Sequence, residues 1–317
     1  MQTTITRRHF LERATAASAL LMCGRPLSAA GRMFVSLNGS LTPGVGGADK
    51  IRLAARAGYG GVDWDFGPAR KAGLEETRAL FAEVKIRPTI VGLPMQQPFG
   101  GEDAEFRAKL PQLADDAAFT AAVGCQKMMV VLSPASPRPK DEQRKLVVDR
   151  VSAISEVLQK SKIRLGLEFL GPLYMRSGPG RDGSPRHPFI WTLPETVALA
   201  TDCGPNIGAV LDVWHWHHSG GTVPDILATD KSRIVHVHLS DAVAQDPETV
   251  RDNQRRMPGE GIIDLNGFLG ALGKIGYEDG VSPEPLGRIP KEMTPEEGAR
   301  LGLETTLAAL KKAGVGG

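Results

Sequence analysis

Two short apolar runs stand out in the middle of the chain: Arg164-Leu165-Gly166-Leu167-Glu168-Phe169-Leu170 and Ile207-Gly208-Ala209-Val210-Leu211-Asp212-Val213-Trp214. A helix-like pattern over residues 193–201 separates them. Buried strands that alternate with helices are typical of a parallel α/β fold. The pattern therefore predicts two consecutive parallel strands, each interrupted by a carboxylate where a buried strand should carry none.

The same alternation continues in both directions along the chain. Further apolar runs cover residues 33–37, 61–66, 87–93, 127–132, 233–239 and 280–286. Helical patterns cover residues 49–57, 74–84, 105–123, 141–160, 223–228, 265–275 and 295–313, the last with Thr294 as its N-cap. Eight such units predict a single-domain (β/α)₈ TIM barrel. A doubly wound open sheet is the alternative, and it is weakened because no Gly-rich phosphate loop follows the first strand.

The composition excludes several classes of protein. The chain has 317 residues, of which 41% are hydrophobic and 23% charged, as in an ordinary globular protein rather than a disordered, collagenous or multi-span membrane chain. Without residues 1–30, the chain keeps 34 basic and 35 acidic residues and is close to neutral, because four arginines (Arg7, Arg8, Arg13 and Arg25) and Glu12 are removed. A neutral chain has no electrostatic footprint for nucleic acid or anionic lipid. We also expect Cys125 and Cys203 to be buried thiols.

The N-terminal sequence predicts a targeting segment rather than part of the fold. The pair Arg7-Arg8 precedes an apolar stretch over residues 14–22, and small residues follow at Ser28, Ala29 and Ala30. This arrangement resembles a twin-arginine export signal, although an ordinary basic helix start is the alternative. We therefore expect an export signal over residues 1–30, a barrel over residues 31–317 and a periplasmic location.

Three carboxylates and one histidine interrupt consecutive late strands: Glu168, Asp212, His238 and Glu284. An unpaired carboxylate inside a barrel costs several kcal/mol, so each of these groups needs a cation or hydrogen-bond donors. The four side chains are expected to converge at the barrel mouth. Such a set suits one divalent ion, Mn²⁺ as first choice, or Mg²⁺, Co²⁺ or Zn²⁺.

The spacing of the histidines separates a ligand from its neighbours. His236 and His238 point to the same face of their strand, with His238 nearer the mouth and His236 a core residue one layer deeper. His215 lies three residues after the sixth-strand carboxylate, so it is expected beside the metal rather than on it. Two further histidines are expected in a solvated loop: His217 and His218.

Several motifs together resemble those of the xylose-isomerase-like superfamily of TIM barrels. They are Leu211-Asp212-Val213-Trp214-His215, His236-Val237-His238-Leu239-Ser240-Asp241 and Pro258-Gly259-Glu260-Gly261. The resemblance extends from about residue 33 to about residue 310. The superfamily includes sugar isomerases and epimerases, inosose dehydratases and type IV AP endonucleases.

The resemblance to its ketose 3-epimerase branch implies a role for each matching residue. The metal ligands would be Glu168, Asp212, His238 and Glu284, and the two glutamates would also be the acid/base pair. Substrate oxygens would contact His215 and Arg255, or Arg256 with a one-residue slip. The implied activity is a divalent-metal-dependent isomerase or epimerase that acts on a non-phosphorylated sugar or keto-sugar through an enediolate.

Other activities are tested by the same motifs. The endonuclease branch needs extra histidine ligands after the third and fourth strands. Here these strands end in Gly92-Leu93-Pro94-Met95 and Leu132-Ser133-Pro134, which contain no histidine. The Asp-x-His motif of that branch is replaced by Asn253-Gln254-Arg255. That branch is therefore excluded. Two alternatives stay open: a lyase of the inosose dehydratase or keto-glycoside-eliminating type, and a non-catalytic carbohydrate-binding barrel.

The expected ligand is a small sugar or polyol, and export argues against a phosphorylated one. Trp214 is expected to share a strand face with Asp212 and to contact the substrate. Asp63 and Asp65 would share a face of the second strand. The insertion over residues 171–190 is either a substrate lid or a solvated loop. A nucleic-acid or membrane partner is not expected, and a homo-oligomer is left open.

Overall fold

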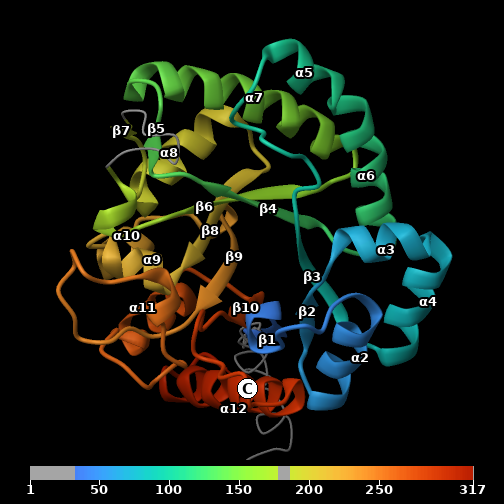
Figure 1. The fold of residues 1–317 in the computed structure, drawn as a ribbon, viewed down its shortest axis with the longest axis vertical. Helices are drawn as coiled ribbons and strands as arrows, with labels where there is room; N and C mark the ends of the chain where they lie inside the picture. The colour runs from blue at the N-terminus through green and yellow to red at the C-terminus, as the bar shows by residue number, and fades with distance from the viewer. Residues whose placement is uncertain (1–32, 178–185, 317) are drawn as a thin grey trace, which may run out of the picture.

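The barrel closes through eight parallel strands. The computed structural model describes residues 33–177 and 186–316, and the strand order around the ring is β1-β10-β9-β8-β6-β4-β3-β2 (Figure 1). The expected single-domain (β/α)₈ barrel is therefore confirmed. The export signal expected over residues 1–30 lies outside the described residues.

Each barrel strand begins and ends within three residues of its expected position. They are β1 (Phe34–Leu37), β2 (Gly61–Asp63), β3 (Arg87–Gly92), β4 (Lys127–Leu132), β6 (Arg164–Phe169), β8 (Ile207–Asp212), β9 (Ile234–Leu239) and β10 (Gly280–Pro283). A separate antiparallel pair is formed by β5 (Ala135–Ser136) and β7 (His187–Pro188). This pair joins the fourth-strand loop to the insertion after β6.

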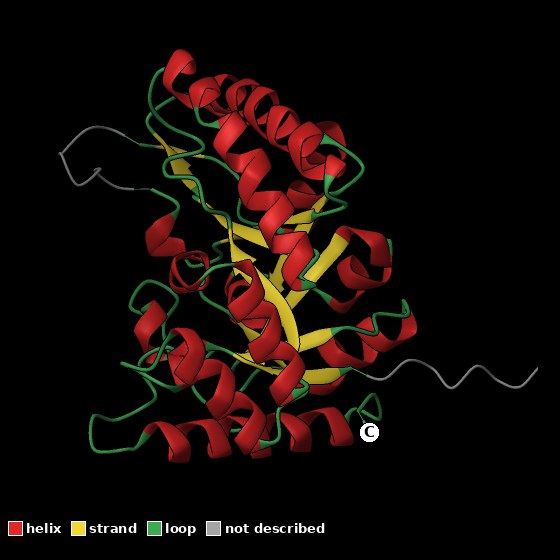
Figure 2. Ribbon diagram, turned by 90° about the vertical axis from the view of Figure 1, so that its right-hand side faces the viewer, coloured by secondary structure: helices red, strands yellow, loops and turns green. Residues whose placement is uncertain are grey.

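Helices surround the barrel on its outside (Figure 2). They are α2 (Gly47–Ala57), α3 (Phe66–Ala72), α4 (Leu74–Val84), α5 (Asp103–Ala108), α6 (Leu110–Val123), α7 (Lys140–Lys160), α8 (Leu193–Cys203), α9 (Val213–His218), α10 (Val223–Leu227), α11 (Leu265–Lys274) and α12 (Pro295–Lys312). Thr294 caps α12 as expected, since its side chain accepts from the Glu297 amide. Within the described ranges, no helix combines the length and apolarity needed to cross a membrane.

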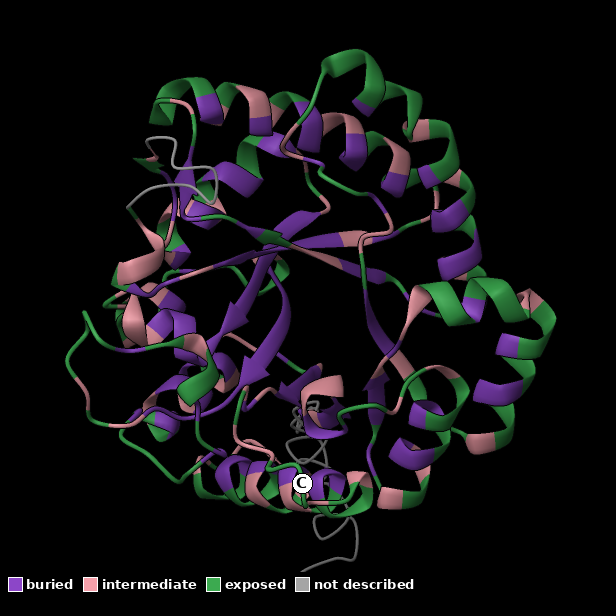
Figure 3. Cartoon of the chain, in the orientation of Figure 1, coloured by how far each residue is buried: buried purple, intermediate pink, exposed green. Residues whose placement is uncertain are grey.

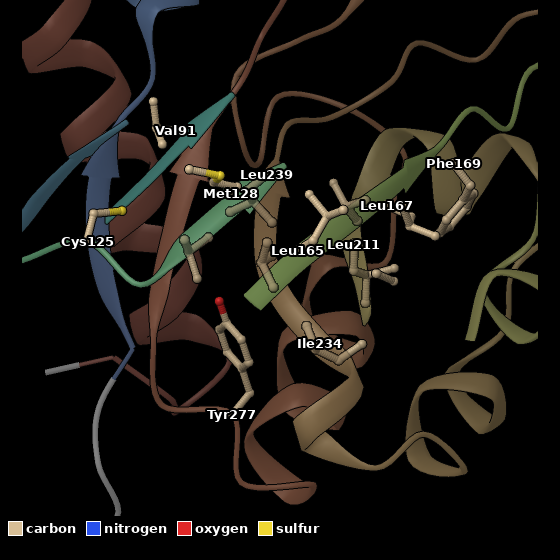
Figure 4. Close-up of a cluster of buried hydrophobic side chains, with 14 of the residues drawn as sticks. Val91, Cys125, Met128, Leu165, Leu167, Phe169, Leu211, Ile234, Leu239 and Tyr277 are labelled. Carbon is tan, nitrogen blue, oxygen red and sulfur yellow. The ribbon is translucent and has the colours of Figure 1, made fainter. Parts of the chain in front are cut away.

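The main core lies between the strands and the helices. Strand residues alternate between the barrel interior and this outer layer. The layer is filled by large apolar side chains, including Met128, Leu165, Leu167, Phe169 and Leu211, all fully buried (Figure 4). The strands are accordingly mostly buried, whereas the helices expose their outer faces (Figure 3). Cys125 and Cys203 are free, buried thiols, as expected.

The sixth barrel strand ends earlier than expected. It ends at Asp212, because the Asp212 carboxylate accepts hydrogen bonds from the backbone amides of Trp214 (2.7 Å) and His215 (3.2 Å) and so caps α9. The expectation that Trp214 shares a strand face with Asp212 is therefore wrong. The solvated loop expected for His217 and His218 is also wrong: both lie half-buried in α9, and burial lowers the pKa of His218 to about 4.

Two other expectations fail for local reasons. The helix expected over residues 105–123 is split at Lys109 into α5 and α6, with a proline in the first turn of α6. The second barrel strand ends at Asp63, so Asp63 and Asp65 do not share a strand face. Asp65 instead bonds Lys50 Nζ at 2.7 Å, on the helical layer.

Candidate metal centre

Four consecutive barrel strands bring the predicted ligand residues together. Glu168, Asp212, His238 and Glu284 each offer one donor atom, and these atoms lie within 4.8 Å of one another. Asp212 pairs in register with His238, and Glu284 directly follows β10, where its amide donates to the Leu239 carbonyl at 2.8 Å. The residues therefore meet at the C-terminal end of the barrel, the end that carries active sites in this fold.

His238 links the two glutamates of the cluster. Its Nδ1 lies 2.8 Å from Glu168 Oε1 and 3.4 Å from Glu284 Oε2, while its Nε2 is buried without a hydrogen-bond partner among the described residues. Burial alone would lower the pKa of His238, but the carboxylates of Glu284 and Glu168 outweigh it and raise the pKa well above the usual value. The protein's own groups thus favour a positive charge at this point. Three carboxylates and an imidazole suit a divalent cation there.

The same surroundings push the pKa values of the two glutamates apart. Burial raises the pKa of Glu168, although His238 opposes this rise. Burial acts in the same direction on Glu284, but the positive charges of His238 and Arg255 outweigh it and lower the pKa of Glu284. Two carboxyl groups with diverging pKa values are suited to opposite roles in proton transfer.

Arg255 lies on the buried side of the cluster and not on the side that faces solvent. Its Nη1 donates to Asp212 Oδ2 at 2.6 Å and to Glu284 Oε2 at 3.1 Å, and its Nε donates to Asp252 Oδ1 at 2.9 Å. Its Nη2 lies 3.1 Å from His215 Nε2. A guanidinium can only donate, so His215 accepts this hydrogen bond.

The three residues expected to touch the substrate are almost inaccessible. Trp214, His215 and Arg255 have 0%, 2% and 1% of their surface exposed, respectively. The Arg255 guanidinium lies 4.8 Å from the centre of a Trp214 ring and covers one face of the indole. His215 lies beside the cluster, as expected, but faces Arg255. In this arrangement the tryptophan supports Arg255 instead of offering a free face to a sugar.

A set of polar side chains beside and below the cluster was not predicted as a group. Asp63 Oδ1 accepts from Ser36 Oγ (2.8 Å) and Ser282 Oγ (2.9 Å), and Asn38 Nδ2 donates to Asp63 Oδ2 (3.2 Å) and Glu284 Oε1 (3.4 Å). His236 Nε2 lies 2.7 Å from Ser282 Oγ, so it is the deeper core histidine that was expected. The sequence did contain a signal for this set. Residues 36 and 38 are two apart, as are residues 282 and 284, so each pair is expected to point to the same side of the sheet.

Asp241 organises the loop that carries Arg255. Its carboxylate accepts from the backbone amides of Ala242 (2.9 Å), Gly259 (3.1 Å), Gly261 (2.9 Å) and Ile263 (2.9 Å). A side chain at Gly261 would place its Cβ 2.2 Å from the Ala242 carbonyl oxygen, so only glycine allows this approach. The backbone of Arg256 pairs with Asp241, which leaves Arg255 rather than Arg256 at the cluster.

Replacement of Asp241 by Asn should destabilise the protein by about 2–4 kcal/mol, because one carboxylate oxygen becomes an amide nitrogen that cannot accept from two of these four N–H groups. Chemical denaturation measures this loss. The matched control is Asp246→Asn on the same long loop, where an exposed carboxylate accepts from the Glu248 amide and less than about 1 kcal/mol is expected. Equal losses in the two variants would contradict an anchoring role for Asp241.

Comparisons with known proteins match this architecture. A family model described as "Xylose isomerase-like TIM barrel" matches residues 51–310. An inosose isomerase from Bacillus subtilis (strain 168) is 27% identical over 176 residues, which cover 55% of this chain and 58% of that protein. The alignment thus spans less than two thirds of the relative, and residues beyond it are not matched.

Solved structures extend the similarity over most of the chain. A xylose isomerase domain protein from Alicyclobacillus acidocaldarius subsp. acidocaldarius has a TM-score of 0.80 and 27% identity, covering 89% of this chain and 99% of its own. The IolI protein, whose crystal structure holds a zinc atom, has a TM-score of 0.73 and 22% identity, with coverage of 89% and 99%. The second of these supports the fold alone.

Proposed function

We propose that this chain, which belongs to the xylose isomerase-like TIM barrel family, is a divalent-metal-dependent isomerase or epimerase of a non-phosphorylated sugar or keto-sugar. The observation that carries the proposal is the convergence of Glu168, Asp212, His238 and Glu284 within 4.8 Å. The inosose isomerase relative and the zinc atom in the IolI structure support it. The export expected from Arg7-Arg8 favours a substrate without phosphate.

The cluster residues would hold the metal through three carboxylates and the His238 imidazole. A divalent ion bound there would acidify the C–H between a carbonyl and an adjacent hydroxyl and would stabilise the enediolate. Asp212 is held by Arg255 and by the amides of α9, so it serves as a fixed ligand. Glu168 and Glu284 come from opposite ends of the four-strand set, on either side of His238.

Proton transfer falls to the two glutamates. Glu284, whose pKa is lowered, is the group that stays ionised and accepts the substrate proton, and Glu168, whose pKa is raised, is the group that returns a proton. In the reverse reaction the roles exchange. Burial lowers the pKa of His215, so its imidazole stays neutral and keeps the Arg255 guanidinium in place.

Metal affinity should increase with pH. His238 must lose its proton when it becomes a ligand, and its pKa is raised above the usual value. Below that pKa we expect the Mn²⁺ affinity to rise about tenfold per pH unit, and to level off above it. Calorimetric titration between pH 5.5 and 8.5 measures this dependence, with His217→Gln as a control histidine outside the cluster. A flat profile below pH 7 would contradict the assignment of His238.

The activity is tested by proton exchange in D₂O. Mn²⁺-loaded protein is incubated with unphosphorylated ketoses, inososes and 3-keto-glycosides, and NMR follows the C–H next to the carbonyl. We expect deuterium at that carbon with the carbon skeleton intact. Loss of water or of an aglycone instead assigns the chain to the lyases. No exchange, in a protein that holds one metal per chain, assigns it to the binding barrels and overturns the proposal.

A further inference from the structure

One side of the barrel mouth is open and apolar. Val131 on β4 pairs in register with Glu168 on β6, and paired residues of neighbouring parallel strands point to the same side of the sheet. Val131 therefore faces the barrel interior, beside the cluster. It is 47% exposed, whereas Glu168 is 5% exposed. Since side chains normally fill a barrel interior, the space in front of Val131 is open.

The neighbouring strand continues this open surface. Gly92 on β3 pairs with Met129, which lies two residues before Val131 on the same face of β4. A Cβ built on Gly92 would meet no atom within 4 Å, and Gly92 is exposed although it lies in a strand. We refer to the inner surface formed by Gly92, Met129 and Val131 as the β3–β4 wall.

The wall lacks side-chain hydrogen-bonding groups. A substrate hydroxyl that faced it would leave water without gaining a partner, which is unfavourable. The β1–β2 side of the interior is different, because Asn38 and Asp63 place an amide and a carboxylate next to Glu284. The mouth thus has one polar side and one apolar side, with Glu168 at the boundary of the apolar side.

The cluster meets solvent through its two glutamates, whose side chains are 17% (Glu284) and 7% (Glu168) exposed. Asp212 and His238 are each 1% exposed, and Arg255 closes the cluster from behind. A molecule that approaches through Glu168 lies along the β3–β4 wall, whereas Asn38 and Asp63 line the approach to Glu284. A fully hydroxylated free sugar is poorly suited to this surface, whereas an apolar substituent on the sugar gains from burial there.

We propose that the substrate is a keto-sugar derivative with an apolar substituent, such as a glycoside with an apolar aglycone, and that Gly92, Met129 and Val131 select this substituent. The inference rests on the proposed function, because the keto-sugar portion is assigned to the cluster. It adds a specificity subsite on β3 and β4 to the metal centre.

The test compares methyl and butyl 3-keto-β-glucosides as probes of the Mn²⁺-loaded full chain. Calorimetry measures their binding, and deuterium exchange measures turnover. Complete burial of one methylene strengthens binding about fourfold, so partial burial of three should raise affinity and kcat/KM about tenfold or more from methyl to butyl. Val131→Asn should remove most of this gain, and Gly92→Val should remove it by filling the open space. Leu307→Asn, at an equally exposed residue (47%) on α12, should leave it intact.

The outcomes separate this inference from the proposed function. Equal affinity for the two probes, with exchange on both, overturns the apolar subsite and leaves the isomerase proposal standing. A tenfold gain in affinity without exchange supports the subsite and overturns the proposed activity. A gain that survives in both Val131→Asn and Gly92→Val places the substituent elsewhere and overturns the assignment. Failure of both probes to bind also overturns it.

Discussion

Glu168→Gln is expected to lower kcat/KM by about 10²–10⁴-fold while the substrate Kd changes less than tenfold. Gln keeps the size of the side chain and one oxygen that can face a metal, but it cannot carry the proton. Burial raises the pKa of Glu168, so the wild-type carboxyl group holds a proton more readily than an exposed glutamate and is suited to returning one. An effect confined to turnover is the expected signature of this role. Steady-state kinetics and calorimetric binding measure the two quantities.

The matched control is Glu195→Gln, which removes a carboxylate from an ion pair with Lys140 on the helical layer. We expect its kcat/KM to stay within about twofold of the wild type, because this carboxylate pairs with Lys140 and not with a residue of the cluster, and exposed pairs contribute little. Metal analysis and circular dichroism establish that both variants fold and that Glu168→Gln retains its metal. Turnover within tenfold of wild type in Glu168→Gln would exclude the assigned role of Glu168.

The sequence was sufficient for the fold and for the residues of the cluster. Strand alternation is a local property, so Glu168, Asp212, His238 and Glu284 could be placed on inward-facing positions near the strand ends. The closed barrel then brings consecutive strands together without further assumptions. Whether these side chains act as ligands stays a prediction, but their convergence follows from the pattern alone.

The remaining features depend on tertiary contacts that no local pattern encodes. The apolar run that contains Trp214 was read as one strand, but Asp212 caps a helix within it and turns the indole under Arg255. The position of Arg255 depends on the loop that Asp241 anchors. The opening in front of Val131 could not be predicted either, because exposure inside a barrel depends on what the other strands and loops leave unfilled.

Arg255→Met should destabilise the protein by about 3–5 kcal/mol in the presence of a chelator. The substitution keeps apolar bulk under the cluster, but it removes the cation that pairs with Asp212 (2.6 Å) and Glu284 (3.1 Å), and it leaves both buried carboxylates without their guanidinium partner. The Asp252 carboxylate and His215 also lose a donor. Chemical denaturation followed by circular dichroism measures the loss.

Mn²⁺ should restore much of this stability, because a divalent cation at the cluster neutralises the same two carboxylates. Mn²⁺ at about 100 times the wild-type Kd adds about 2.7 kcal/mol to the wild type by mass action, and the variant should gain more at that concentration because its carboxylates have lost the guanidinium. The control is Arg288→Met. Arg288 pairs with Glu260, and the two side chains are 29% and 33% exposed. We expect this variant to lose at most about 1 kcal/mol of stability and to respond to Mn²⁺ no more than the wild type does. If Mn²⁺ stabilised Arg255→Met and the wild type equally, the arginine and the metal would not share Asp212 and Glu284. A larger gain in Arg255→Met, as expected, would mean that the arginine and Mn²⁺ neutralise the same two carboxylates.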